Sequence, residues 1–374
     1  MESEANDSNL ANDKSKAPKV SRRTVLTGLV LGGVCAGLLL EDADCQDLLA
    51  PSRETEDKPK NGSKVPLFYS KGYNISAFGL EHLHPFDGRK YQKIYEALTN
   101  PKGPRRPSSV ERPAALSEAA LLKVHSKEYL DSLGDSRVLS RILEVGILAK
   151  LPAGVIDWRI LKPMRLAARG TMAACRAALQ MGLAINIGGG YHHADKDQGG
   201  GFCVYCDIPI AIKTLRQEGL LKTALIVDTD AHQGNGFANV ARGESQLFVL
   251  DYFDESIYPH PKVKEDWSIP FPRNTDGRTY LSELKSTLPV ALEKYKPDLV
   301  AYNAGSDVLD SDPLSTFRLK VEEMNERDLF VVETTRRMNI PLAMVLAGGY
   351  GKDSAIAHTK SIESILARFD GRTG

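Results

Sequence analysis

Side chains that can bind a metal stand at alternate positions where one apolar stretch of the sequence ends. In LIVDTDAHQGNG, residues 225–236, Asp228, Asp230 and His232 come directly after a run of aliphatic and β-branched residues. Alternate side chains of an extended backbone point to the same side, so Asp230 and His232 can bind one cation together. One more carboxylate would complete a three-ligand site with an open position, which catalytic zinc requires.

Four other apolar runs also end in polar side chains and glycines. AINI leads into His192 and His193, LFVL into Asp251, LVAY into Asp307 and AMVL into Tyr350. Ligands of an open parallel α/β sheet bind beyond the carboxyl ends of the strands, so these loops should converge at one edge. A strand-end aspartate alone is more often a turn former or a helix cap. Three of the eight histidines of the chain lie in two of these loops, and the combination therefore favours a catalytic metal site in which Asp307 is the third ligand.

The elements that must position these residues follow an alternating pattern. Short apolar runs with β-branched residues predict strands, and longer runs with helical periodicity separate them. Strands that are apolar on both faces indicate a parallel sheet that is covered on both sides. The predicted strands are 65–70, 184–188, 223–228, 246–251, 298–303 and 341–348, and the predicted helices are 117–133 with Ser117 as N-cap, 161–182, 280–295, 325–338 and 354–369.

Composition places this sheet in a large globular domain. The chain has 374 residues, of which 42% are hydrophobic and 26% charged, so it can bury a large core. Lys plus Arg and Asp plus Glu both number 48, which argues against a basic field for nucleic acid. Cys203 and Cys206 form a C-x-x-C without a second pair, and we interpret them as packed thiols. Neither an internal repeat nor a second linker is visible, and we expect one domain over residues 65–374.

Residues 1–64 differ from the rest and predict a tail outside that domain. Arg22 and Arg23 stand before an apolar, glycine-rich stretch over residues 25–40, and a polar linker follows over residues 41–64. The arginine pair resembles a twin-arginine export signal, and we expect export to the periplasm or cell envelope. The alternatives are an uncleaved membrane anchor or a cytoplasmic protein. Membrane contact is expected only through this segment.

Four segments resemble the signatures of one enzyme family. GGGYHHADKDQGGGFC (188–203), VDTDAHQGNG (227–236), YNAGSD (302–307) and LAGGY (346–350) are similar to segments of zinc-dependent histone deacetylases of the arginase-deacetylase fold. YNISAFGLEHLHPFD (73–87) brings the resemblance closest to class IV. The resemblance runs from about residue 65 to the C-terminus. It implies a single α/β domain with a central, mainly parallel eight-stranded sheet flanked by helices, and a narrow channel leading to zinc.

The resemblance also implies roles for individual residues. It assigns zinc to Asp230, His232 and Asp307, acid-base work to His192 and His193, and transition-state stabilisation to Tyr350. It also counts Asp228 and Asn235 with the catalytic residues, and Asn235 stands where class I members have an aspartate behind the second histidine. The remaining assignments are Asp228 and Asp251 for a structural potassium ion, and Gly190, Phe202, Leu314 and Tyr258 for the channel.

The expected activity is the hydrolysis of an amide by metal-activated water. The substrate would be an acyl-lysine of a protein, with acetyl or a longer fatty acyl group, since class IV relatives are associated with long acyl chains. Deacetylation of acetylpolyamines or other small amides is the alternative, and a non-catalytic acyl-lysine-binding protein is a third hypothesis. A two-manganese ureohydrolase is disfavoured because Gly234 stands where the second metal needs a carboxylate. The sequence leaves the oligomeric state open.

Overall fold

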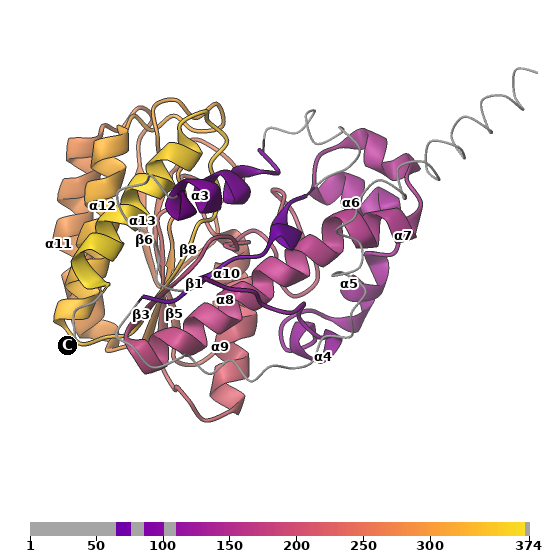
Figure 1. Cartoon of the computed structure of the whole chain (residues 1–374), viewed down its shortest axis with the longest axis horizontal. Coiled ribbons are helices and arrows are strands. Elements are labelled where there is room, and N and C mark those ends of the chain that lie inside the picture. Colours follow the sequence, from indigo (N-terminus) through magenta and orange to yellow (C-terminus); the bar gives the residue numbers. More distant parts are fainter. Residues whose placement is uncertain (1–64, 76–85, 101–109, 371–374) are drawn as a thin grey trace, which may run out of the picture. The chain divides into compact units, whose positions relative to one another are not determined.

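The computed structural model describes residues 65–75, 86–100 and 110–370, which belong to one compact unit, Glu56–Gly374 (Figure 1). The predicted export signal and linker over residues 1–64 lie outside the described residues. Among the helices that are described, none combines the length and the hydropathy that a membrane span needs.

An eight-stranded sheet forms the centre of this domain, and every pair of neighbouring strands is parallel. The strand order is β2-β1-β3-β8-β7-β4-β5-β6. This confirms the predicted α/β fold class with its central parallel sheet. The strands are β1 Leu67–Phe68, β2 Val110–Glu111, β3 Leu183–Asn186, β4 Ala224–Asp228, β5 Leu247–Asp254, β6 Trp267–Phe271, β7 Leu299–Asn303 and β8 Leu342–Val345.

Six of these strands match the predicted ones, and the two edge strands were not predicted. The central strands β3, β4, β7 and β8 are buried along their whole length, because helices cover both faces of the sheet. β2 has only two residues, too few for any pattern. β6 is partly exposed and contains Pro270, which a sheet tolerates at its edge.

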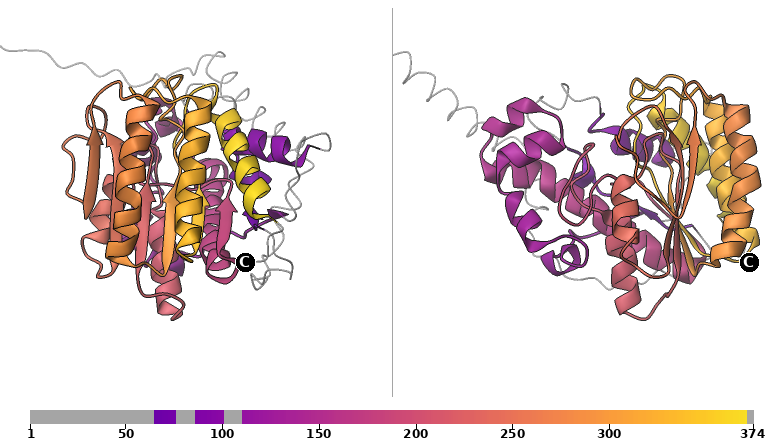
Figure 2. Two further views of the ribbon diagram at one scale, coloured as in Figure 1. Left: turned by 90° about the vertical axis from the view of Figure 1, so that its left-hand side faces the viewer. Right: turned by 180° about the vertical axis from the view of Figure 1, so that it is seen from behind.

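Helices cover both faces of the sheet (Figures 1 and 2). On one side lie α11, α12 and α13, and on the other α8, α9 and α10. The helices are α3 Lys90–Thr99, α4 Glu118–Leu121, α5 Lys127–Ser132, α6 Ser136–Ile142, α7 Ala153–Ile156, α8 Lys162–Met181, α9 Asp207–Gln217, α10 Asn235–Ala241, α11 Gly277–Tyr295, α12 Val321–Arg337 and α13 Ser354–Phe369.

One predicted helix is wrong as a continuous element. Residues 117–133 form two short helices, α4 and α5, and each begins at its own serine cap. Ser117 Oγ accepts the Ala120 N–H at 3.3 Å, which confirms that N-cap, and Ser126 Oγ accepts the Tyr129 N–H at 3.3 Å. Between them His125 is buried, with Nδ1 2.7 Å from the Asp195 carbonyl oxygen. The second cap and this tertiary contact end the first helix early.

Candidate metal and catalytic centre

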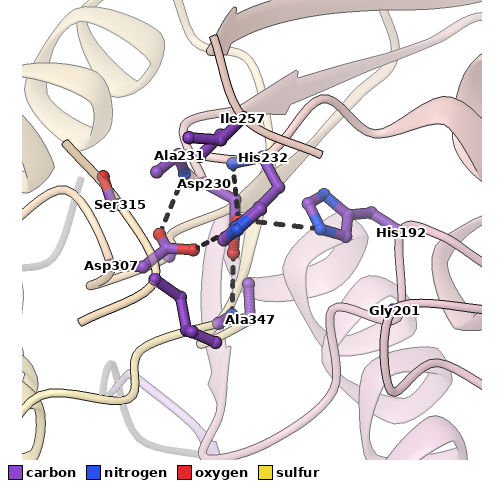
Figure 3. Close-up of polar contacts among 12 residues, drawn as sticks. His192, Gly201, Asp230, Ala231, His232, Ile257, Asp307, Ser315 and Ala347 are labelled. Carbon is purple, nitrogen blue, oxygen red and sulfur yellow. Dashed lines mark hydrogen bonds and ion pairs between the residues drawn. The ribbon is translucent and has the colours of Figure 1, made fainter. Parts of the chain in front are cut away.

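The loops that follow β4 and β7 bring three predicted metal ligands together at the carboxyl edge of the sheet. One ligand atom from each of Asp230, His232 and Asp307 can be chosen so that all lie within 4.8 Å of one another, and all three residues are buried. Figure 3 shows the three side chains pointing toward a common centre, with His192 beside them. The convergence that parallel topology predicts is therefore present.

Hydrogen bonds fix the orientation of both carboxylates. His232 Nδ1 lies 2.9 Å from Asp307 Oδ2 and 3.2 Å from Asp230 Oδ1 (Figure 3). The other oxygen of each carboxylate accepts a backbone N–H, from Gly348 to Asp230 at 2.8 Å and from Ala231 to Asp307 at 2.9 Å. One oxygen of each carboxylate thus accepts a hydrogen bond from the backbone of a loop, and the other oxygen faces the imidazole of His232.

The composition of this cluster suits a divalent metal. One imidazole nitrogen and two carboxylate oxygens in a buried site are a donor set that zinc accepts. Burial alone would lower the pKa of His232, but the carboxylates of Asp230 and Asp307 raise it to about 10. The cluster therefore attracts positive charge. Gly348 also keeps space free, because a Cβ there would lie 2.5 Å from Asp230 Oδ2 and 2.8 Å from Asp307 Oδ2.

The two predicted histidines lie next to each other beside this cluster, with 47° between their ring planes, but they have different partners. Their ring centroids are 4.0 Å apart. His192 Nδ1 lies 3.0 Å from Asp228 Oδ2, and His193 Nδ1 lies 2.7 Å from Asn235 Oδ1. An amide oxygen can only accept, so His193 carries its proton on Nδ1 and leaves Nε2 free as a base.

Their environments separate the two pKa values. Burial by itself would lower the pKa of His192, but the carboxylates of Asp230 and Asp228 raise it to about 9. Burial, together with the neighbouring His192 and His232, holds the pKa of His193 well below its usual range. The two pKa values are shifted in opposite directions, so His192 favours the charged form and His193 the neutral form, which is the division that acid-base catalysis uses.

Tyr350 closes the site from the loop after β8. Its ring centroid lies 6.3 Å from that of His232 and 5.7 Å from that of Phe202. Burial raises the pKa of its phenol, so the hydroxyl keeps its proton and can donate a hydrogen bond. Asp312 Oδ2 accepts the backbone N–H groups of Tyr350 and Gly351 at 2.7 and 3.0 Å and fixes the loop.

An apolar cavity extends from these catalytic candidates. Gly190 and Phe202, which the resemblance assigns to the channel, are among its lining residues. Leu314 and Tyr258 do not line it. The ring centroid of Tyr258 lies 4.8 Å from that of His193, and the residue is 42% exposed, so a role for it in the channel stays a prediction. Other lining residues, which no sequence pattern indicates, include Leu143, Val145, Leu148, Ile160 and Met164.

Lys90 is a further residue near the centre that the sequence did not indicate. Its buried Nζ donates to the carbonyl oxygens of Ala347 and Gly348, both at 2.8 Å. Burial lowers its pKa to about 8, although Asp307 and Asp230 act in the opposite direction. No sequence pattern distinguishes a buried lysine at the start of a helix from an exposed one.

The predicted potassium ligands lie behind His192. Asp228 and Asp251 are register partners on β4 and β5, and Asp251 Oδ2 accepts the Gly234 N–H at 2.7 Å. Burial, followed by the neighbouring Glu265 and Asp228, raises the pKa of Asp251. Asp228 and Asp251 are thus buried beside the half-buried Glu265, and a bound proton or cation would offset their negative charge.

Comparisons with known proteins agree with this geometry. Residues 84–366 match the histone deacetylase domain family. The chain is 37% identical to histone deacetylase 2 of Arabidopsis thaliana over 306 residues, which are 81% of this chain and 79% of that protein. Among solved structures, the HD domain of HDA15 superposes with a TM-score of 0.66 at 18% identity, over 83% of this chain and 91% of that one.

A second solved structure shares the fold. Acetylpolyamine aminohydrolase from Burkholderia pseudomallei has a TM-score of 0.65 at 16% identity, over 81% of this chain and 99% of that one. At such identities the two structures establish the arginase-deacetylase fold, whereas the family match and the Arabidopsis relative establish membership. This chain therefore belongs to the histone deacetylase family.

Proposed function

We propose that this chain is a zinc-dependent amidohydrolase that removes acyl groups from lysine side chains. One observation carries the proposal. The cluster of Asp230, His232 and Asp307, the histidine pair and Tyr350 all lie together beside one apolar cavity. A metal site alone would fit a binding protein. The additional presence of a neutral base, a cationic partner and a phenol donor favours an enzyme.

Asp230, His232 and Asp307 would hold the zinc ion. When bound, the metal would supply Lewis acidity to the amide carbonyl and to water, weakened because two carboxylates cancel its charge. The surrounding residues must therefore contribute strongly. Tyr350 would donate its hydroxyl proton in a hydrogen bond to the carbonyl oxygen as negative charge develops there. A typical single donor of this kind stabilises the transition state by about 3 kcal/mol.

The histidine pair would move the protons of the reaction. His193 Nε2 takes a proton from the attacking water, because its Nδ1–H is already donated to Asn235. His192 stays positively charged beside Asp228 and stabilises the developing negative charge. The carbon–oxygen bond forms, the carbon–nitrogen bond breaks, and the pair returns the proton to the departing lysine amine. The products are a carboxylic acid and a lysine side chain with a free amine.

We infer that the acyl group enters the apolar cavity and that longer acyl groups are preferred, as in class IV. Leu143, Leu148, Ile160 and Met164, which line the cavity, come from outside the loops of the sheet. Each buried CH₂ contributes about 0.8 kcal/mol, so an octanoyl chain gains over acetyl wherever the cavity accommodates it. An acetyl group is too short to contact most of these side chains.

A substrate panel tests both parts of the proposal. The full chain, loaded with zinc, is assayed with acetyl-, octanoyl- and myristoyl-lysine peptides and with acetylpolyamines, and Asp230→Ala is the control for contaminating activity. We expect kcat/KM to rise from acetyl to octanoyl and longer chains. A maximum at acetyl-lysine would refute the chain-length preference, a preference for acetylpolyamines would favour the alternative substrate, and turnover of neither class would refute the enzyme.

We also propose that residues 1–64 carry an export signal and that potassium binds between Asp228 and Asp251. Replacing Arg22 and Arg23 by lysine should retain the protein in the cytoplasm of a bacterial host with the twin-arginine pathway, and unchanged localisation would refute the signal. Potassium should raise the melting temperature relative to choline, and Asp251→Ala should remove that difference. Equal melting temperatures in the two salts would refute the cation site.

A further inference from the structure

A buried ion pair lies on α12, outside the ligands and the histidine pair. Arg327 and Asp328 are both fully buried. Arg327 Nε and Nη2 lie 2.9 and 2.8 Å from Asp328 Oδ1, and the Tyr302 hydroxyl donates to the same oxygen at 2.5 Å. Taking two charges out of water is costly, and an apolar pair of similar volume is often as stable. Stability alone therefore does not account for this pair.

The remaining contacts of the guanidinium point to a role. Arg327 Nη1 donates to the Thr229 carbonyl oxygen at 3.0 Å and to the Gly305 carbonyl oxygen at 2.8 Å. Thr229 directly precedes Asp230, and Gly305 lies two residues before Asp307. One nitrogen atom thus joins the two loops that supply all three candidate ligands.

These two carbonyl groups lie where the sheet ladder ends. The Thr229 N–H still donates to the Asn303 carbonyl oxygen at 2.9 Å, and among the described residues no further backbone–backbone hydrogen bond joins the two loops beyond this contact. Buried carbonyl groups need donors, and Arg327 supplies one to both. Gly305 packs closely on the first ligand, since a Cβ there would lie 2.5 Å from Asp230 Oδ2. A change in loop spacing would therefore displace Asp230 relative to Asp307.

We propose that Arg327 is a positioning residue that sets the distance between the Asp230–His232 loop and the Asp307 loop, and thereby the metal affinity of the site. This inference rests on the proposed function, because it assumes that the three residues bind zinc. Asp328 and Tyr302 hold the guanidinium in the orientation that reaches both loops. Partners behind metal ligands typically change metal affinity 10–100-fold when they are replaced.

The test measures metal binding rather than activity. The zinc Kd is determined by competition with a chelator for the wild type, Arg327→Lys and the double variant Arg327→Met/Asp328→Leu. The double variant leaves no unpaired buried charge, and Arg327→Lys keeps a positive charge beside Asp328 if the double variant does not fold. We expect the zinc Kd to rise at least 10-fold in each folded variant. The visible spectrum of the cobalt-substituted protein should change as well, since it reports ligand geometry.

Val331→Ala is the matched control, because it removes a buried side chain from the same helix. It should lower the melting temperature and leave the zinc Kd within about twofold of the wild type. A zinc Kd within about twofold of the wild type in both Arg327 variants would show that the ion pair is merely structural. If the wild type itself binds no zinc, the proposed function fails and this inference with it, an outcome distinct from the previous one.

Discussion

Two walls of the apolar cavity, which make up most of its lining, are built in different ways. The sheet wall consists of the loops after β3 and β8, and its backbone is held by hydrogen bonds, as when Gly190 N–H donates to Asp207 Oδ2 at 2.8 Å. The helical wall consists of apolar side chains from residues 143–164, which run from the end of α6 into the first turn of α8, namely Leu143, Val145, Leu148, Ile160 and Met164. Phe202 joins the two walls, since it lines the cavity and its N–H donates to the Ile142 carbonyl oxygen at 3.0 Å.

This difference suggests that the sheet wall determines the rate of the reaction and that the helical wall determines which acyl groups fit. The sheet wall cannot shift without leaving buried polar groups unpaired, which costs about 1–3 kcal/mol for each group. Apolar side chains of similar volume replace one another at less than about 1.5 kcal/mol. We therefore expect changes on the sheet wall to alter the rate for every substrate, and changes on the helical wall to alter the ranking of acyl groups.

The largest effect is expected at Tyr350, on the sheet wall. Tyr350→Phe removes the hydroxyl donor and keeps the ring that packs against Phe202. We expect kcat to fall about 10²-fold or more for short and long acyl groups alike, while zinc content stays near one per chain. Steady-state kinetics together with metal analysis check this result. Asp230→Ala is the comparison, because it should lose the zinc as well, and a Tyr350→Phe enzyme with normal kcat would exclude the phenol from the reaction.

A smaller and selective effect is expected on the helical wall. Leu148 is 3% exposed and lines the cavity, whereas the neighbouring Ile147 is 42% exposed and does not. Leu148→Phe should fill part of the cavity and lower the ratio of kcat/KM for octanoyl-lysine over acetyl-lysine by about 10-fold, which corresponds to the burial of roughly two CH₂ groups.

Ile147→Phe is the matched control for that substitution, since it adds the same ring one residue away on the exposed side. The octanoyl to acetyl ratio should stay the same in this variant. Equal ratios for Leu148→Phe and the wild type would mean that the acyl chain lies elsewhere and that the helical wall does not select substrates.

The same two walls also differ in how far the sequence predicts them. The sheet wall follows from a general rule, because polar residues and glycines at the ends of buried parallel strands must meet at one edge. Asp230, His232 and Asp307 could therefore be grouped from spacing alone, and the structure places them together. The family resemblance supplied the histidine pair and Tyr350 as well.

The helical wall offered no comparable rule. Leu148 belongs to a short 3₁₀ helix, Gly146–Lys150, and Ile160 to a π-helical turn, Asp157–Leu161, and elements of five residues are too short to show an apolar period. Arg327 and Lys90 look like ordinary charged residues of helices, and only tertiary packing buries them. Likewise, the edge strands β2 and β6 are too short or too exposed for a strand pattern.

The smallest expected effect concerns the asymmetry within the sheet wall itself, where His192 faces a carboxylate and His193 an amide. Asn235→Asp would place a carboxylate beside His193 Nδ1 and favour the imidazolium, so the pKa of His193 should rise from its depressed value. The base must be neutral to accept a proton from water. The acid limb of kcat/KM should therefore move to higher pH, while the limb set by His192, whose partner Asp228 is unchanged, should stay in place. Asn235→Ala removes the hydrogen bond without adding charge, so it should lower the rate without moving the acid limb to higher pH. If the acid limb stays in place in Asn235→Asp, His193 is not the base. His192 would then have to act as the base and His193 as its partner.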